Sequence, residues 1–310
     1  MTRLFLVRHG QTTSNEIHAL DTALPGASLT TLGREQAGAA GRYLRNASDR
    51  VHVLSSQAAR AQQTAAGLAT AFAAEGGAIA AAAPGSSFAE GFQRFRGREL
   101  AGLVDTAAVE LAGEYAGSLA SVFGVAEIPA GDMEMKNDED SHELYHRLLG
   151  DWLHGQIDKV VPGGSSGAEV LTSYLPQALA VVAAAQAEDA DAVLVSHGAV
   201  IRLVATWLGA VDPEFAYRAY LPNGQVVSIA LPEDFGELLD QVVEAVDEQF
   251  RNGVRGRFRV TEWGPFGVPE LASTQQNRLQ PSYPGAKPAS PSRARGGGGR
   301  RYRSGGRARG

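Results

Sequence analysis

Three short apolar runs, each ending in polar residues, constrain the fold of this chain more than any other feature. They lie at residues 3–8, 50–56 and 191–198. Continuous apolar runs of this length are typical of strands that are buried on both faces of a parallel sheet. Long stretches of good helix formers lie between or after them, at residues 29–46, 57–76, 168–188 and 199–209. This alternation predicts an α/β fold, a three-layer sandwich with helices on both faces of a central, mostly parallel sheet.

Further strands and helices are expected in the rest of the chain. Residues 225–231 and 257–263 are strand-like, and they flank an acidic amphipathic helix expected at 235–250. Another helix is expected at 138–161 and is followed by the glycine-rich loop VPGGSSG. Two local features are also expected from residue type: Thr31 as the cap of the helix at 29–46, and a kink or restart at Pro176.

Composition divides the chain into two parts. The chain's net charge is −6, and the nine Lys and Arg residues after Glu270 contribute +9, so residues 1–270 carry −15. The segment from 272 to 310 is rich in Pro, Ser, Gly and Arg and has little to bury, which predicts disorder. We therefore expect one catalytic domain over residues 1–271, with 77–124 as a partly helical insertion over the active site, followed by a basic tail.

Several classes of protein are excluded by what the sequence lacks. The chain has no cysteine, so disulfides, thiolate nucleophiles and thiolate metal sites are excluded. The apolar part of the N-terminus is too short for a signal peptide, and we expect no apolar run long enough to span a bilayer. We therefore expect a cytoplasmic protein with no membrane contact.

Basic and imidazole side chains stand where the predicted strands end. Arg8 and His9 end the first strand, and Ser196 and His197 end the third. Ligands bind at the carboxyl edge of a parallel sheet, where both ends would meet. Arg60 lies in the first turn of a helix, where a cation opposes the helix dipole unless an anion lies beside it. These placements predict a phosphate-binding site.

The motifs that carry these residues are LVRHGQTTSN, SSQAARAQQTA and VSHG. In this combination and order they resemble the histidine phosphatase superfamily, which is also called phosphoglycerate mutase-like. The resemblance covers most of residues 1–232 and implies the fold of that family, with no cofactor and no metal. It also implies a small phosphorylated substrate, which a phosphatase of this family would hydrolyse through a phosphohistidine.

The resemblance implies a role for each residue of the motifs. His9 would be the nucleophile, because covalent catalysis divides one difficult step into two. Arg8, Arg60 and His197 would neutralise the transferring phosphoryl group, since the guanidinium fork suits phosphate oxygens. Substrate contacts are also implied for two residues of the first loop, Asn15 and Gln11.

The proton donor to the leaving oxygen has two candidates. The segment EIPAGDMEM resembles the family's acid-bearing pattern and makes Glu127 the preferred donor. Glu90, in FAEGFQRFRGREL, is the rival, although its spacing to the next Gly and Glu differs from the pattern.

Alternative functions remain open at this stage. A phosphoglycerate mutase-type phosphotransferase would use the same residues, and a binding module with a degenerate pocket is another possibility.

A zinc hydrolase is a more distant alternative. The stretch HELYH at 142–146 matches a zinc-binding pair, His142 and His146, with Glu143 as base. A half-exposed amphipathic helix explains HELYH more simply, because a catalytic zinc needs a third ligand in a dry cleft. The basic tail also suggests weak contact with a polyanion.

Overall fold

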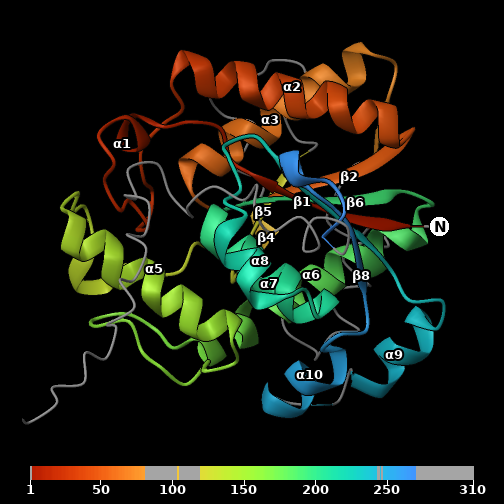
Figure 1. The fold of residues 1–310 in the computed structure, drawn as a ribbon. Helices are drawn as coiled ribbons and strands as arrows, with labels where there is room; N and C mark the ends of the chain where they lie inside the picture. Colours follow the sequence, from red (N-terminus) through yellow and green to blue (C-terminus); the bar gives the residue numbers. More distant parts are fainter. Residues whose placement is uncertain (1, 81–102, 105–118, 243–244, 246, 270–310) are drawn as a thin grey trace, which may run out of the picture.

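The computed structural model describes residues 2–80, 103–104, 119–242, 245 and 247–269. In these residues an eight-stranded mixed sheet runs in the order β4-β5-β2-β6-β1-β7-β8, with β3 also paired to β2 (Figure 1). The strands are β1 (Arg3–Arg8), β2 (Arg50–Ser56), β3 (Ala78–Ala80), β4 (Leu103–Val104), β5 (Ala120–Val122), β6 (Asp191–Ser196), β7 (Val226–Ala230) and β8 (Arg259–Trp263). The helices are α1 (Thr13–Glu16), α2 (Thr31–Ala47), α3 (Ala59–Ala74), α5 (Glu139–Leu153), α6 (Gly167–Ala187), α7 (Gly198–Gly209), α8 (Pro213–Arg218), α9 (Phe235–Val242) and α10 (Asp247–Val254).

The centre of the sheet is parallel and its edges are partly antiparallel. Strand β6 pairs in parallel with β1 on one side and with β2 on the other. Strand β5 extends the parallel part beyond β2, whereas β4, β7 and β8 pair antiparallel. Arg8 lies opposite Ser196 in the register, so β1 and β6 end at the same edge of the sheet. The predicted α/β sandwich is confirmed.

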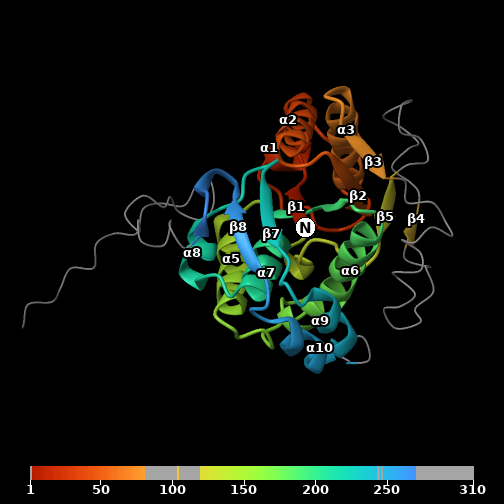
Figure 2. The ribbon, with the colours of Figure 1, turned by 90° about the vertical axis from the view of Figure 1, so that its right-hand side faces the viewer.

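Helices cover both faces of the sheet because side chains alternate along each strand. In β1, Phe5 and Val7 join a core with α2 and α3. Leu4 and Leu6 point the other way, into a larger core with α5, α6, α7 and α8. Figure 2 shows α2 and α3 on one side of the sheet and α6, α7, α9 and α10 on the other.

Local details differ from expectation at three helices. The cap of α2 is Thr30, whose hydroxyl accepts from the Gly33 N–H, so the prediction of Thr31 is wrong by one residue. Helix α5 ends at Leu153, well before residue 161, and α6 continues through Pro176 without the predicted restart. The expected acidic helix at 235–250 is two helices, α9 and α10. Asp247, with φ of 45°, begins α10 in a left-handed conformation that a continuous helix does not allow.

Much of the expected insertion at 77–124 lies outside the described residues, so its position over the active site stays a prediction. Where its expected helical part is described, at Leu103–Val104 and Ala120–Val122, the chain forms strands, so the helix is wrong there. Its described parts are the short strands β3, β4 and β5, which add to the β2 edge of the sheet. The basic tail lies outside the described residues from 270 onward, so its disorder and polyanion contact stay predictions.

Helix α6 has the length and composition of a membrane span, contrary to the expectation that no run is long enough. Sixty-one per cent of its most apolar window is buried inside the protein. Leu171, Leu175 and Leu179 belong to the larger core, which accounts for the apolar composition of this helix.

Candidate active site

The two histidines of the motifs meet where β1 and β6 end. The backbone N–H of His9 donates to the Ser196 carbonyl at 3.0 Å, which joins the two strands one residue beyond their last paired position. The ring centroids of His9 and His197 lie 5.3 Å apart, with an edge-to-face angle of 64°. The sheet edge therefore brings together these two side chains, which are far apart in the sequence, as predicted.

The hydrogen bonds of His9 distinguish its two ring nitrogens. Its Nδ1 lies 2.7 Å from the Gly10 carbonyl, which can only accept, so Nδ1 carries the proton. The other nitrogen, Nε2, makes no hydrogen bond with a described residue and keeps its lone pair. Burial lowers the pKa of His9 well below 6.5, and Arg60 and Arg8 lower it further. His9 is therefore neutral at neutral pH, as a nucleophile must be.

Arg60 is 2% exposed and lies beside His197. Its Nε donates to Nδ1 of His197 at 3.3 Å, and Nε2 of His197 lies 2.9 Å from the Ser56 hydroxyl. Nδ1 is thus the acceptor and Nε2 carries the proton. Burial lowers the pKa of Arg60, an effect that Asp21 and Glu127 oppose, and Asp21 lies 3.9 Å from its Nη1. His197 supports Arg60 here, and its own contact with a phosphoryl group stays a prediction.

Arg8 is held by the chain segment that follows α8. Its Nη1 donates to the Leu221 carbonyl at 2.5 Å, and its Cζ lies 4.9 Å from the centroid of the Tyr220 ring. Gly198 leaves room for the guanidinium, since a Cβ there would lie 2.9 Å from Nε of Arg8. Nε is buried and has no hydrogen-bond partner among the described residues.

The loop after His9 carries the two predicted polar contacts. The Oδ1 of Asn15 accepts from the Thr12 N–H at 3.1 Å and from Nδ2 of Asn223 at 3.2 Å. The Oε1 of Gln11 accepts from the Thr30 hydroxyl at 2.9 Å. Both side chains are thus oriented by their neighbours, and both line the cavity described below.

Glu127 reaches the same sheet edge through β5, which runs parallel to β2. Its carboxylate accepts from the N–H groups of Ala199 at 3.1 Å and Val200 at 2.9 Å, at the start of α7. It accepts also from the Ile128 N–H at 2.9 Å. The preferred donor therefore lies in the cavity, whereas its rival, Glu90, lies outside the described residues. Its role as donor stays a prediction.

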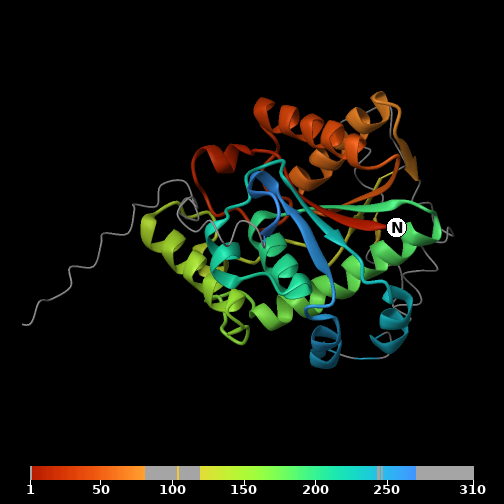
Figure 3. The ribbon, with the colours of Figure 1, turned by 45° about the vertical axis from the view of Figure 1, so that its right-hand side comes forward.

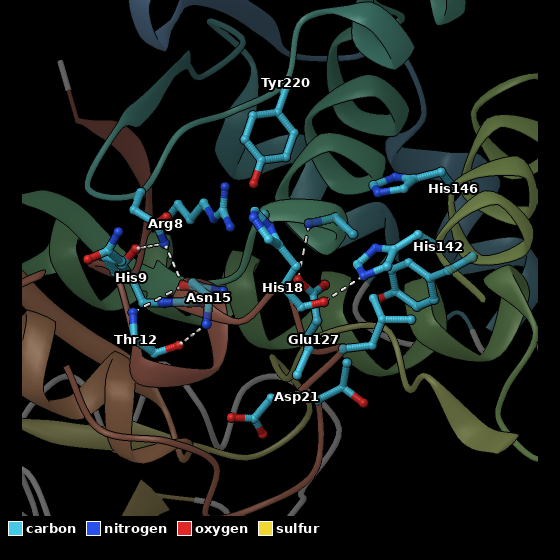
Figure 4. Close-up of a pocket in the computed structure, with 18 of the residues that line it drawn as sticks. Arg8, His9, Thr12, Asn15, His18, Asp21, Glu127, His142, His146 and Tyr220 are labelled. Atoms are coloured by element: carbon cyan, nitrogen blue, oxygen red, sulfur yellow. Dashed lines mark hydrogen bonds between the residues drawn. The ribbon is translucent and has the colours of Figure 1, made fainter. Parts of the chain in front are cut away.

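All of these side chains except His197 line one cavity of about 540 Å³ (Figure 4). His197 is fully buried behind it. Arg8, His9, Asn15 and Glu127 line the cavity, together with residues of α5 and of the segment after α8. Figure 3 shows α5 and α8 beside this edge of the sheet, with α1 on the side of α2. The remaining lining residues are Gln11, Thr12, His18, Ala19, Leu20, Asp21, Thr22, Arg60, Asn137, Glu139, His142, Tyr145, His146, Gly198, Ala199, Arg202, Tyr220 and Asn223.

The HELYH stretch forms a wall of this cavity. His142 and His146 do share one face of α5, with ring centroids 6.2 Å apart. The expected half-exposed amphipathic helix is confirmed, because α5 has one buried and one exposed face, and His146, 8% exposed, lies on the buried face. Nε2 of His142 lies 2.6 Å from the His18 carbonyl, which requires a proton on that nitrogen. The described residues contain no group of three side chains that could hold a metal ion, so the zinc hypothesis lacks its third ligand there.

Sequence reasoning missed Arg202, Tyr220 and Asn223, which also line the cavity. Arg202 had a signal, because an arginine in the otherwise apolar stretch AVIRLVATWLG is unusual for a buried helix. Burial lowers its pKa to about 10. The sequence gives no such signal for Tyr220 and Asn223, since they belong to an irregular connection between α8 and β7.

Solved structures share this fold at low sequence identity. Mycobacterial hydrolase 1 has a TM-score of 0.54 and 19% identity, with 85% of this chain and 99% of the other covered. Mycobacterial glucosyl-3-phosphoglycerate phosphatase in complex with inorganic phosphate has a TM-score of 0.50 and 19% identity, with 85% and 97% covered. At such identities these similarities show the fold alone.

Sequence comparison adds one curated relative and one family. The PE-PGRS family protein PE_PGRS11 of Mycobacterium tuberculosis is 48% identical over 63 residues, which are 20% of this chain and only 11% of that protein. The model of the histidine phosphatase superfamily, branch 1, matches residues 4–76 and 105–243, more than half of the chain. The matched ranges contain every predicted catalytic residue. This chain therefore belongs to branch 1 of the histidine phosphatase superfamily.

Proposed function

We propose that this protein is a phosphatase that hydrolyses monoesters of small phosphorylated metabolites through a phosphohistidine on His9. The observation that carries the proposal is the state of His9, a neutral imidazole whose Nδ1 is protonated and whose Nε2 is unengaged. It lies beside two buried arginines in a cavity of about 540 Å³, a volume typical of small-molecule sites. Membership of the histidine phosphatase superfamily supports the reaction class.

In the first step, Nε2 of His9 attacks the phosphorus atom of the bound ester. The new N–P bond forms as the bond from phosphorus to the leaving oxygen breaks, and the leaving oxygen takes its electron pair. Arg8 and Arg60 offset the charge on the phosphoryl oxygens, where buried cations are most effective. A proton from Glu127 would neutralise the leaving oxygen, so that an alcohol departs.

In the second step, water attacks the phosphorus atom of the phosphohistidine. Glu127, now a carboxylate, would take a proton from that water, which restores the acid for the next cycle. The N–P electron pair returns to Nε2, and inorganic phosphate leaves. A mutase would differ only at this point, because a second phosphorylated molecule would take the place of water.

The test is phosphate release from p-nitrophenyl phosphate and from a panel of alkyl phosphomonoesters, with and without a strong chelator. Wild type should release inorganic phosphate in both conditions and His9→Ala should release about 10³-fold less or none. His154→Ala is the matched control, since His154 is an exposed histidine at the end of α5 that does not line the cavity.

The intermediate gives a second measurement. Rapid quenching of wild type with substrate should trap acid-labile phosphate on the protein, and His9→Ala should trap none. Activity that needs metal, persists in His9→Ala and is lost in His142→Ala would contradict the proposal and favour the zinc hypothesis. Conversion of a phosphorylated substrate to its positional isomer, with little phosphate released, would favour the mutase.

A further inference from the structure

Two contacts orient the guanidinium of Arg8, and both come from one short segment, residues 216–221, which includes the end of α8. Tyr220 places its ring over the guanidinium, 4.9 Å from Cζ, and the Leu221 carbonyl accepts from Nη1. The remaining nitrogens, Nε and Nη2, make no hydrogen bond with a described residue. Figure 4 shows the ring of Tyr220 above Arg8, with its hydroxyl directed toward the middle of the cavity. Two contacts from one segment thus hold the guanidinium.

Arg202 holds the other end of this segment. It is 2% exposed, and its Nε donates to the Ala216 carbonyl at 2.9 Å, while Nη2 donates to the Tyr217 carbonyl. Arg202 lies one helical turn after Gly198 on α7, so the two lie on the same face of that helix. A Cβ at position 198 would lie 2.9 Å from Nε of Arg8, so the helix backbone lies close to the guanidinium there. Helix α7 therefore approaches Arg8 at one position and anchors the segment at the other.

We propose that Tyr220 is a positioning residue for phosphoryl binding, which acts by fixing the guanidinium of Arg8, and that Arg202 anchors the segment carrying Tyr220. This inference rests on the proposed function of Arg8 as a phosphate ligand. A free arginine side chain has many rotamers, and restricting them before the ligand arrives removes an entropic cost from binding. The ring also attracts the guanidinium, most strongly where water is excluded.

The hydrogen bond and the ring together fix the plane of the guanidinium. The Leu221 carbonyl engages one of the two N–H groups of Nη1, and the Tyr220 ring lies over Cζ. Coplanar N–H groups bind two phosphate oxygens in bidentate geometry only when their plane is directed at the ligand. Rotation of the guanidinium away from the Tyr220 ring would redirect these N–H groups. The ring thus selects the plane in which bidentate binding is possible.

The experiment measures the affinity of the purified full chain for orthovanadate, by calorimetry and by inhibition of hydrolysis. Tyr220→Leu removes the ring and should weaken vanadate binding about 3- to 30-fold. Tyr220→Phe keeps the ring and should stay within about twofold of wild type. Tyr217→Leu is the matched control, because Tyr217 belongs to the same segment but packs near Gly150 of α5 and does not line the cavity.

A double-mutant cycle separates positioning from a general structural role. If Tyr220 acts through Arg8, then Tyr220→Leu should weaken vanadate binding much less in an Arg8→Met background than in wild type. Equal losses in both backgrounds would overturn the inference, as would unchanged binding by Tyr220→Leu alone. The anchor is tested with Arg202→Lys, which should weaken binding less than Arg202→Met while both retain the wild-type circular dichroism spectrum.

Failure of the proposed function gives a different result. Two results would refute phosphate binding by Arg8 and this inference together. In one, wild type binds no vanadate, and in the other, Arg8→Met binds vanadate as tightly as wild type does. Binding that depends on Arg8 but not on Tyr220 would refute the inference alone.

Discussion

Replacing His52 by glutamine should make the stability of this protein less sensitive to acid. His52 lies within β2 and is fully buried, opposite Ala80 of β3 and Ala192 of β6. Burial lowers its pKa from 6.5 to about 4, with Glu188 opposing this shift and Arg50 adding to it. The pKa of the folded state is thus below that of the unfolded state. Stability is therefore complete above pH 6.5 and is lost as the pH falls toward 4.

The magnitude follows from proton binding to one imidazole. With a pKa of 6.5 unfolded and about 4 folded, protonation favours the unfolded state by about 2 kcal/mol at pH 5. The same calculation gives only about 0.2 kcal/mol at pH 7. Glutamine removes the proton-binding site, so the loss of unfolding free energy between these two pH values should shrink by about 2 kcal/mol. Any cost of repacking around glutamine is the same at both pH values and cancels.

The assay is urea unfolding followed by tryptophan fluorescence, at about pH 7 and about pH 5. All three tryptophans are buried, so their emission reports on the folded core. Val51→Ala on the same strand is the control, because it weakens the core without removing a titrating group. If His52→Gln loses as much unfolding free energy on acidification as wild type, the reasoning from burial is wrong.

Two further predictions concern the cavity. Glu127→Gln should lower kcat for alkyl phosphates by about 10²- to 10⁴-fold, but much less for p-nitrophenyl phosphate, whose leaving group needs no proton. A similar loss with both substrates would show that Glu127 is not the donor. Gly198→Ala should lower kcat/KM by about 10- to 100-fold, because its Cβ would lie 2.9 Å from Nε of Arg8 and displace the guanidinium. Gly236→Ala is its control, with nothing within 4 Å of the added Cβ, and equal activity of the two variants would contradict the steric argument.

The sequence predicted those site residues whose position follows from local structure. Arg8, His9 and His197 directly end or follow parallel strands, so the topology alone brings them to one edge. The position of Arg60 could be predicted because it lies in the first turn of α3, directly after β2. These residues could be predicted from the sequence because the end of a strand is encoded by the residues next to it.

Residues that act through the path of a connection could not be predicted in the same way. The contact of Tyr220 with Arg8 depends on where the chain runs after α8, which no short-range pattern encodes. Strand β5 was missed because three residues carry too little periodicity, although it is the strand that delivers Glu127 to the site. The break between α9 and α10 was missed because the apolar stripe continues across it, while Asp247 adopts a left-handed conformation.

The charges around His9 would have opposite effects on its two partners in the proposed mechanism. There, a proton and a phosphoryl group compete for the same nitrogen, Nε2. Burial, Arg60 and Arg8 all disfavour the proton, because each opposes a positive charge on the imidazole. The same arginines would attract a phosphoryl group, whose oxygens are negative, by coulombic attraction and hydrogen bonding. In the proposed mechanism the two arginines therefore keep His9 unprotonated without opposing the approach of phosphate.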